Sequence, residues 1–516
     1  MLHKTPWPSP RSSHQYFQDR AARAGVRHRL LKLLVALAAG AATVLSFGPF
    51  NQQWIGIAGP ALLFYLWLGA PPRFAFVTGI CFGVGLFGVG VSWTYVSMNV
   101  YGNMPGPLAG LAAMLFVLLL ALFPAAVGAL QAYSNAPRAA RLALVIPTCW
   151  TLVEWVRSWI LTGFPWLSLG YGQIDSALSG MAPWLGVFGV TLFSTVFSGL
   201  LVVVFIGETT RQRIAGACAI ALLWAIAWNA GGFSQIGVAG TPLRVALVQG
   251  NVPLERKWQP SRQEGILNMY LELSDRHPDR DLIVWPEAAL PLFLDQLPAT
   301  FWRRLEDHPA DFVTGILERS VTTGSERSYN SVVGVAEDRV LYRKAHLVPF
   351  GEFLPFPALF SWIIDYLDIP MSDFSEWEGG QRTMTIAGVP AAVSICYEDA
   401  FQDEMRRALG DAEMMINVSE DSWFGDSLAP HQRLDMARMR TLENGRPMIR
   451  AGNSGISAVI DHGGNVIARA PQFQRTVLLS EVQPTTGRNP FVIYGSWPVV
   501  IACAIVLLIS LVARRR

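Results

Sequence analysis

A cysteine in the second half of the chain occupies a setting in which a thiol can act as a nucleophile. Cys396 follows the apolar run Ala391–Ile395 and precedes polar residues, so we expect it where a strand passes into a helix. Backbone N–H groups at such a junction can lower the pKa of a thiol and bind an oxyanion. A buried and unreactive cysteine is the alternative. The setting makes Cys396 a candidate nucleophile.

A carboxylate and an amine stand in comparable settings upstream of this cysteine. Glu287 ends an apolar run, and Lys344 follows the strand-like Arg339–Leu341. A buried carboxylate can take the proton of a thiol, and a fixed cation can stabilise a thiolate or an oxyanion. Solvated side chains are the alternative for both. His346 would serve in a papain-like dyad with Cys396, although no Asn or Asp in a recognisable setting supports that pairing.

The composition separates this chain from soluble globular proteins. Of its 516 residues, 52% are hydrophobic and 15% are charged, whereas an ordinary domain has about 25% charged residues. This length predicts two or more domains. The net charge of +2 implies no polyanionic partner, so we expect no nucleic-acid binding. Four of the five cysteines lie in apolar runs, which excludes a disulfide framework in the polar part, and no His or Cys spacing indicates a metal site.

Eight apolar runs predict a multi-pass membrane domain, because a helix needs about 20 apolar residues to cross a bilayer. The second and seventh runs are short and can be partly re-entrant, and Thr162–Met181 is too broken to span. A cleaved signal peptide is the alternative for the first run, and it would leave the sidedness unchanged. The runs are Leu30–Phe47, Trp54–Gly69, Phe74–Val96, Leu108–Tyr133, Leu142–Ile160, Trp184–Ile206, Ile214–Asn229 and Trp497–Val512.

Lys and Arg residues indicate how these helices are oriented. They occur in the N-terminal tail, in alternate short loops and at Arg514–Arg516, whereas residues 48–53, 97–107 and 161–183 contain none. The positive-inside rule then places both termini in the cytoplasm and the domain after the seventh helix outside it. Arg157, near the end of the fifth helix, is the one irregular charge.

The segment between the seventh and eighth helices reads as a layered α/β domain, because β-rich runs alternate with helical periodicity. Ser261–Ser274 and His431–Asn444 are the expected helices. The expected strands are Arg244–Val252, Leu282–Trp285, Phe312–Leu317, Ser331–Val335, Ala391–Ile395, Met414–Val418 and Ile456–Ile460. The predicted segments are a basic cytoplasmic tail, a seven-helix membrane domain, an extramembrane domain and a final transmembrane helix, at residues 1–29, 30–230, 242–484 and 497–512.

The segment Phe353–Leu367 is unusually apolar for a soluble surface. It directly follows Glu352 and reads FLPFPALFSWIIDYL. A buried core element is one interpretation. The other is a mobile arm that contacts lipid over the site, since an exposed apolar patch of this kind marks an interaction surface.

The motifs around the three candidate residues together resemble a known family. PEAALP contains Glu287, KAHLVPFGEFLP begins at Lys344 and SICYEDAF contains Cys396, in the order and at the separations usual for the carbon–nitrogen hydrolase (nitrilase) superfamily. HLVPFGE and NVSEDSWFGDSLAPHQ narrow the resemblance to the apolipoprotein N-acyltransferase family, as do VQGNVPLERKW, GRPMIRAGNSGISAVID and TGFPWLSLGYGQ. The resemblance spans nearly the whole chain and covers the N-terminal tail least.

The resemblance implies a multi-pass membrane domain of about eight transmembrane helices and an extramembrane, nitrilase-like αββα sandwich. It also implies that Glu287 is the general base, Lys344 the cation for the oxyanion and Cys396 the nucleophile. Further functional positions of the family fall on Trp258, Glu352, Tyr397 and Glu398. For these four the alternatives are packing by the two aromatic residues and ion pairs of the two glutamates that hold Lys344.

The activity that the resemblance implies is an acyl transfer in two steps, without metal or cofactor. A membrane phospholipid would acylate Cys396 as a thioester, and the N-terminal amine of a diacylglyceryl apolipoprotein would then take the acyl chain. We expect a membrane-embedded monomer in a bacterial inner membrane, with a periplasmic catalytic domain. A membrane-tethered amidase or nitrilase for a small C–N substrate is the alternative. A non-catalytic assembly or lipid-binding protein is a third, against which the intact triad argues.

Overall fold

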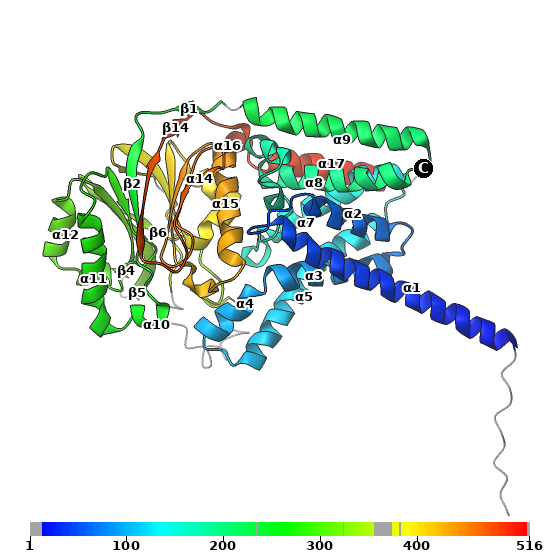
Figure 1. The fold of residues 1–516 in the computed structure, drawn as a ribbon, viewed down its shortest axis with the longest axis horizontal. Helices are drawn as coiled ribbons and strands as arrows, with labels where there is room; N and C mark the ends of the chain where they lie inside the picture. Colours follow the sequence, from blue (N-terminus) through cyan, green and yellow to red (C-terminus); the bar gives the residue numbers. More distant parts are fainter. Residues whose placement is uncertain (1–12, 234, 323–324, 356–373, 381–382, 513–516) are drawn as a thin grey trace, which may run out of the picture.

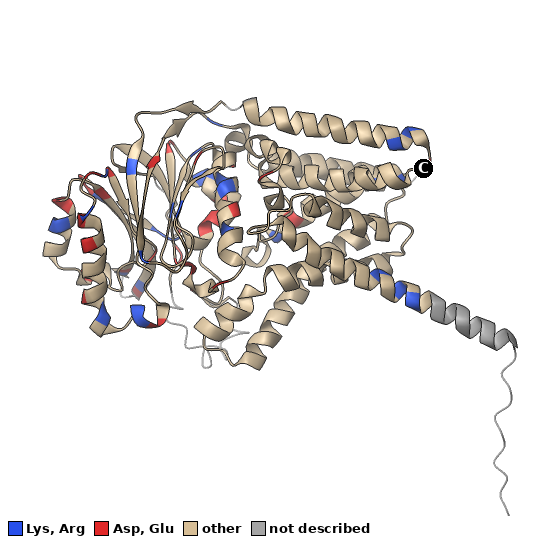
Figure 2. Cartoon of the chain, viewed as in Figure 1, with Lys and Arg blue, Asp and Glu red and all other residues tan. Residues whose placement is uncertain are grey.

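The computed structural model describes residues 13–233, 235–322, 325–355, 374–380 and 383–512, with side chains from residue 25 onward. A bundle of helices lies beside a layered α/β domain, and α17 (Trp497–Val512) leads the chain back to the bundle at its C-terminus (Figure 1). Figure 2 shows that charged residues are dense in the α/β part and sparse along the bundle. This contrast is typical of a protein with one part in lipid and one part in water.

Among the described residues, eight apolar helices lie where the hydrophobic runs predict them. Six helical segments are long and apolar enough to cross a membrane, whereas α2 and α17 are shorter apolar helices. The eight helices are α1 (Ser13–Thr43), α2 (Ile55–Trp67), α3 (Pro72–Gly90), α5 (Gly106–Ala132), α7 (Ile146–Arg157, continuous with the short α6, Arg138–Ala140, and η3, Arg141–Val145), α8 (Ala182–Ile206), α9 (Thr210–Ala230) and α17.

Two helix ends differ from the predicted ones. The seventh helix, α9, has 21 residues, so the expectation that it is short was wrong. The hydrophobic run starts at Ile214, but the helix also takes in the polar turn that begins at Thr210, where the Thr209 hydroxyl caps it. The first helix begins at Ser13 rather than at Leu30, because a helix can continue through basic residues once it has formed.

Small residues allow the membrane helices to approach closely. A Cβ on Gly40 of α1 would lie 1.9 Å from the carbonyl oxygen of Phe82 on α3, and one on Gly85 of α3 would lie 2.0 Å from that of Leu37. Glycine at both positions is therefore required by the α1–α3 contact. Small residues at helix interfaces are the usual means of packing in lipid, where burial of apolar surface supplies no driving force.

Two six-stranded sheets form the centre of the α/β domain. Their strand orders are β13-β2-β3-β4-β5-β6 and β12-β11-β10-β9-β8-β7. The strands of the first sheet are β2 (Leu243–Gln249), β3 (Leu282–Val284), β4 (Asp311–Thr322), β5 (Ser325–Val335), β6 (Arg339–Arg343) and β13 (Thr476–Val482). Those of the second are β7 (Thr383–Ile386), β8 (Val389–Ile395), β9 (Met414–Ser419), β10 (Met448–Gly452), β11 (Ala458–Ile460) and β12 (Val466–Arg469).

The two sheets pack face to face and helices cover their outer faces. One apolar cluster joins the sheets, with Val245, Val284 and Val332 from the first and Val393 and Ile416 from the second. A second cluster lies between the first sheet and helices α11 (Pro260–Asp275) and α12 (Ala299–Glu306). A third lies between the second sheet and helices α14 (Gln402–Ala408) and α15 (Ala429–Asn444). The predicted αββα sandwich is confirmed.

Several strands were not predicted, because charged or exposed residues break the apolar pattern of their sequences. β10 lies between β9 and β11 and contains the buried Arg450, whose charge hides the strand in the sequence. β12 and β13 are edge strands with several exposed residues. The segment between α9 and β2 contains β1 (Gly237–Val238), which pairs with β14 (Thr485–Thr486) just before α16 (Pro490–Tyr494).

The membrane bundle and the α/β domain share a continuous core. Tyr397 and Phe401 from the turn after β8, and Met436 and Met439 from α15, belong to the same apolar cluster as the membrane helices. Helix α15 therefore separates two environments, with the second sheet on one side and the bundle on the other.

Candidate active site

Cys396 lies at the junction that the sequence predicts. β8 ends at Ile395, and the 3-10 helix η9 (Cys396–Ala400) starts at the cysteine itself. The φ angle of Cys396 is +50°, a left-handed conformation that a residue with a side chain adopts at a cost. Hydrogen bonds to its carbonyl oxygen from Asn417 Nδ2 (3.3 Å) and Arg433 Nη2 (2.6 Å) help to hold that conformation.

Glu287, Lys344 and Glu352 form a buried charged cluster. Glu287 follows β3 and Lys344 follows β6, so both lie at the same end of the first sheet. Lys344 Nζ is 2.8 Å from Glu352 Oε1 and 3.6 Å from Glu287 Oε1. Asn330 Nδ2 donates to both carboxylates, at 2.7 Å and 3.0 Å, and the backbone N–H of Glu420 donates to Glu287 Oε2 at 2.8 Å. Three further groups, Glu352, Asn330 and the Glu420 N–H, thus fix one carboxylate beside one ammonium.

The electrostatics of Cys396 connect it to this cluster. Burial raises the pKa of the Cys396 thiol to about 12, and the negative charge of Glu287 adds to the rise, whereas Arg433 and Lys344 oppose it. The expectation that the junction lowers the pKa of the resting thiol was therefore wrong, because desolvation outweighs the favourable donors. A thiol with this pKa is protonated near neutral pH, so a base must take its proton as it reacts.

Lys344 remains a cation in this environment. Burial by itself would lower its pKa, but the charges of Glu352 and Glu287 outweigh burial and hold the pKa above its usual value. With 1% of its surface exposed, Lys344 is not a solvated lysine. The arrangement can take up a proton at a carboxylate, present a thiolate and stabilise negative charge on a carbonyl oxygen.

Glu398 holds the segment that carries Lys344. Its carboxylate accepts hydrogen bonds from the backbone N–H groups of Ile395 (2.7 Å), Ala345 (2.8 Å) and His346 (3.1 Å), and from the hydroxyl of Tyr342 (2.8 Å). Burial raises the pKa of Glu398, and the Ile395 N–H acts in the opposite direction. Glu398 therefore ties β8 to the residues after β6, whereas the ion pair with Lys344 is made by Glu352.

Tyr397 and Trp258 lie on opposite sides of the cluster. The Tyr397 hydroxyl donates to the carbonyl oxygen of Gly163 (3.0 Å), and its ring stacks on Trp166 with the centroids 6.0 Å apart. Tyr397 thus points to the loop between α7 and α8. Trp258 packs with Ala288, the residue after Glu287, in a small apolar cluster of the α/β domain.

The papain-like dyad is not formed among the described residues. The His346 ring nitrogen Nδ1 is 2.8 Å from Glu404 Oε1, and the imidazole stacks on Phe401 with the centroids 3.7 Å apart. The imidazole thus pairs with the Glu404 carboxylate and stacks on Phe401, instead of pairing with Cys396.

Sequence reasoning did not single out several residues that complete the site. Asn330 bridges the two glutamates, and Lys257 pairs with Glu420 (2.6 Å) while donating to the carbonyl oxygen of Glu287 (3.2 Å). Arg433 contacts the sulfur of Cys396 at 3.3 Å. The motif NVSEDSWFGDSLAPHQ contains Glu420 and ends one residue before Arg433, so a longer motif would have found that arginine.

The irregular membrane charge Arg157 holds the loop that meets Tyr397. Its guanidinium donates to the carbonyl oxygens of Phe164 (2.8 Å) and Trp166 and to the hydroxyl of Ser168 (3.1 Å). Arg157 is buried, so these bonds are shielded from water. Arg157, the one irregular charge in the predicted helices, therefore positions the loop on the membrane side of the site.

Arg157→Met is expected to destabilise the protein and to slow its chemistry. It leaves two buried carbonyl groups without their donor, at about 1–3 kcal/mol each. The Trp166 ring would then lose its fixed position against Tyr397. Thermal unfolding in detergent and the rate of acylation of Cys396 measure the two effects. Arg213→Met is the control, because Arg213 also donates to a carbonyl oxygen, that of Gly207, but is exposed at the other end of the bundle. Equal behaviour of both variants would contradict this role.

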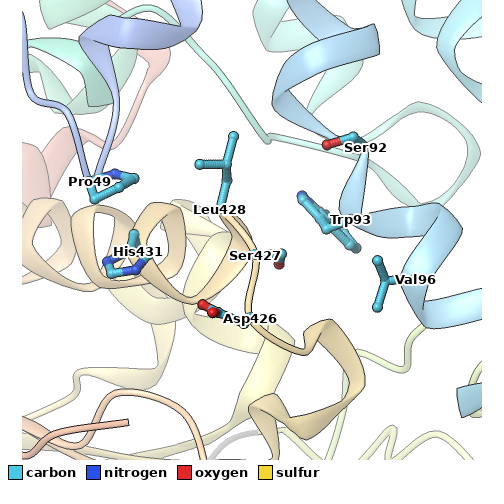
Figure 3. Close-up of a pocket in the computed structure, with 8 residues that line it drawn as sticks. All are labelled: Pro49, Ser92, Trp93, Val96, Asp426, Ser427, Leu428 and His431. Carbon is cyan, nitrogen blue, oxygen red and sulfur yellow. The ribbon is translucent and has the colours of Figure 1, made fainter. Parts of the chain in front are cut away.

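A cavity of about 540 Å³ lies between the two parts of the protein. Figure 3 shows its lining residues facing one another from three segments. Trp93 connects the cavity to Trp166, the residue that stacks on Tyr397, because the ring centroids of Trp93 and Trp166 are 5.2 Å apart. None of Glu287, Lys344 and Cys396 is among the lining residues, which are Pro49, Ser92, Trp93, Val96, Asp426, Ser427, Leu428 and His431.

Two further expectations concern an arm and a metal. Most of the predicted arm Phe353–Leu367 lies outside the described residues, because these end at residue 355 and resume at 374. Within the described ranges, no group of three or more His, Cys, Asp and Glu side chains is placed to hold a metal ion.

Comparison with known families finds matches in both parts of the chain. The sequence model described as "Apolipoprotein N-acyltransferase N-terminal domain" matches residues 39–201, and that described as "Carbon-nitrogen hydrolase" matches residues 244–489. A protein of Saccharomyces cerevisiae, Nit3, described as a member of branch 10 of the nitrilase superfamily, has a solved structure that covers 48% of this chain and 93% of its own, at 20% identity and a TM-score of 0.36.

Curated relatives match over nearly the full length. Apolipoprotein N-acyltransferase of Methylococcus capsulatus is 40% identical over 495 residues, which are 94% of this chain and 96% of that protein. The protein of the same name from Photobacterium profundum is 38% identical over 505 residues, 94% of this chain and 95% of that protein.

Proposed function

Because this chain belongs to the apolipoprotein N-acyltransferase family, we propose that it transfers an acyl chain from a membrane phospholipid to the N-terminal amine of diacylglyceryl apolipoproteins. It is a bacterial inner-membrane protein whose activity is the N-acylation of lipoproteins. The observation that carries the proposal is the buried pair of Glu287 and Lys344, 3.6 Å apart, whose charges both act on the Cys396 thiol. We assign residues 242–484 as the catalytic domain.

In the first half-reaction, Glu287 takes the proton of Cys396 and the thiolate attacks an ester carbonyl of the phospholipid. Lys344 and a backbone N–H, that of Tyr397, stabilise the oxyanion. The C–O bond breaks, the alkoxide of the lysophospholipid takes the proton from Glu287, and a thioester remains. The low exposure of Glu287 (6%) and Cys396 (8%) supports this proton transfer, because both groups are shielded from bulk water.

In the second half-reaction, the amine of the apolipoprotein attacks the thioester. Glu287 takes a proton from the amine, the C–S bond breaks and the thiolate regains a proton. Water competes with the amine, so a site shielded from water favours transfer over hydrolysis. The contact of Tyr397 with Gly163 and Trp166 supports this view, because it closes the site against the membrane part.

The remaining site residues have positioning roles in the proposal. Glu352 holds Lys344, Glu398 holds the backbone that directly follows Lys344, and Tyr397 joins the nucleophile turn to the loop after α7. Trp258 packs against the apolar cluster that contains Ala288, the residue after Glu287. We propose a monomer that needs no cofactor.

The test uses purified protein in detergent or nanodiscs, a phospholipid labelled in its acyl chain and a synthetic diacylated lipopeptide. Label should appear first on the Cys396 peptide and then, after addition of lipopeptide, on its N-terminal amine. A lipopeptide with an acetylated amine is the control and should leave the label on the protein. Labelled fatty acid instead of labelled lipopeptide would favour the membrane-tethered amidase, and absence of label on the protein would contradict covalent catalysis.

A periplasmic position of the catalytic domain is expected from the Lys and Arg pattern. An alkaline phosphatase reporter, active only outside the cytoplasm, should be active when fused after Gln483 and inactive when fused after Arg213, which lies in the first turn of α9 on the opposite side. A reporter that fluoresces only in the cytoplasm should give the reverse result at the same two positions. Activity of the phosphatase after Arg213 alone would overturn the proposed orientation of the chain and of both termini.

A further inference from the structure

A second cation touches the nucleophile directly. Arg433, on α15, has no exposed surface, and its Nη1 lies 3.3 Å from the sulfur of Cys396. Its Nη2 donates to the carbonyl oxygen of the same residue at 2.6 Å. One guanidinium thus contacts both the reacting atom and the backbone of Cys396, which a planar fork of donors can do and a single ammonium cannot.

We propose that Arg433 is a catalytic residue that donates a hydrogen bond to the sulfur of Cys396 and stabilises it as a thiolate in both half-reactions. The inference rests on the proposed function and adds a residue to it. Lys344 and Arg433 then have separate tasks, because Lys344 lies between Glu287 and Glu352 whereas Arg433 holds the sulfur.

The surroundings of Arg433 hold its guanidinium in place beside the sulfur. Arg433 pairs with Asp421 (2.6 Å) and Asp399 (3.0 Å), and Arg450 pairs with the same two carboxylates at 3.0 Å and 2.6 Å. All four side chains have no exposed surface. Two positive and two negative charges cancel, so the cluster is neutral before the thiolate forms. The aspartates fix the plane of the guanidinium, and Nη1 shares its two hydrogens among Ser419 Oγ (2.6 Å), Asp421 Oδ1 (2.6 Å) and the sulfur of Cys396 (3.3 Å). A negative charge on the sulfur would strengthen the shared hydrogen bond to it.

The charges that face Cys396 come from four segments. Glu287 and Asp421 disfavour the thiolate, and Arg433 and Lys344 favour it, with Arg433 the larger of the two favourable effects. The pKa of Arg433 itself lies well above its usual value, because Asp399, Cys396 and Asp421 outweigh its burial. Arg433 therefore stays charged near neutral pH, so it cannot accept the proton of the thiol as a base would.

The proton and charge balance explains why the sulfur needs this donor. When the proton moves from Cys396 to Glu287, the carboxylate loses its negative charge and the sulfur gains one. Lys344 can follow the charge only in part, because Glu352 holds it at 2.8 Å. A hydrogen bond between charged partners is about twice as strong as a neutral one. Arg433 would supply it when sulfur attacks the ester and again when sulfur leaves the thioester.

The experiment measures the reactivity of the sulfur without any lipid. Wild type and Arg433→Gln are treated with iodoacetamide between pH 6 and pH 10, and mass spectrometry follows the Cys396 peptide separately from the other cysteines. In Arg433→Gln, the rise of reactivity is expected to move by at least one pH unit upward, which at a fixed pH is about a tenfold loss of thiolate. A melting curve establishes that the variant is folded.

Two further variants keep the result interpretable. Arg440→Gln removes an equally buried arginine of α15, which pairs with Glu443 and makes no contact with Cys396, and its reactivity profile should match that of wild type. Arg433→Lys keeps the charge that the two aspartates require, so it serves where Arg433→Gln does not fold. It should show a smaller upward shift, because an ammonium cannot reach the sulfur and the carbonyl together.

The lipid reactions then test the role in catalysis. Both acylation by phospholipid and transfer to lipopeptide should slow by a similar factor in Arg433→Gln, about tenfold or more. A profile unchanged in folded Arg433 variants would overturn the proposal, and so would a shift of the same size in Arg440→Gln. Alkylation requires no acyl donor, so a shifted profile without any acyl transfer would leave Arg433 in contact with the thiolate and refute the proposed function instead.

Discussion

Cys396→Ala is expected to abolish the acyl-enzyme completely. Wild-type protein incubated with phospholipid alone should gain the mass of one acyl group on the Cys396 peptide, and neutral hydroxylamine should remove it because the bond is a thioester. The alanine variant has no atom that can form this bond. Cys396→Ser retains a hydroxyl whose far higher pKa leaves it inert, so it should bind the phospholipid without turnover. Intact-protein and peptide mass spectrometry report both results.

The control for this experiment is another thiol. Cys218→Ala removes an exposed cysteine of α9 and should leave the acyl-enzyme at its wild-type level. The other three, Cys81, Cys149 and Cys503, lie on α3, α7 and α17. Burial raises the pKa of the Cys396 thiol to about 12, so its reactivity depends on transfer of the proton to a neighbouring base. An acyl group that persists in Cys396→Ala on any residue would refute the assignment of the nucleophile.

Glu287→Gln is expected to slow acylation on the order of 10²-fold or more, as loss of a general base does. The amide has nearly the shape of the carboxylate, but it cannot take a proton. It must also place its NH₂ group against either Asn330 Nδ2 or the N–H of Glu420, both donors, so some stability is lost as well. Single-turnover acylation, followed by mass spectrometry after rapid quenching, gives the rate, and a melting curve gives the loss of stability.

Glu318→Gln separates these two effects. Glu318 is also buried on the first sheet, where it pairs with Arg343, the neighbour of Lys344, and accepts a hydrogen bond from Ser331. Its replacement should lower the melting temperature by a comparable amount and leave the acylation rate within about threefold of wild type. Comparable rates in the two variants would mean that Glu287 contributes to folding and not to proton transfer.

The sequence predicted the parts of this site that depend on short motifs. PEAALP, KAHLVPFGEFLP and SICYEDAF each place one side chain at the end of a strand, and β3 and β6 end at the same edge of the first sheet. Glu287 and Lys344 could therefore be brought together before any coordinates, and so could the strand–helix junction at Cys396. The membrane helices were predicted because apolar length alone specifies a span.

The parts that escaped prediction depend on contacts between distant segments. In the sequence, Asn330 is an ordinary polar residue of a strand. Its role depends on hydrogen bonds to two glutamates from other segments, which only the fold brings close. The direction of the Cys396 pKa depends on burial, which no motif encodes. β10 was missed because its Arg450 looks like a surface residue, although two aspartates from elsewhere neutralise it. Charge pairs inside a core hide their strands from a hydrophobic pattern.

The shared core between the bundle and the α/β domain predicts that the α/β domain loses part of its structure when it is cut away from the helices. Excision would strip the Tyr397 hydroxyl of its acceptor, Gly163, and would leave the Glu443 carboxylate without the N–H of Val187 (2.7 Å). It would also expose the apolar rings and methionines that α15 and η9 now bury against the helices. A soluble fragment made for crystallisation or inhibitor screening would expose an apolar, aggregation-prone surface on the side that normally faces the helices.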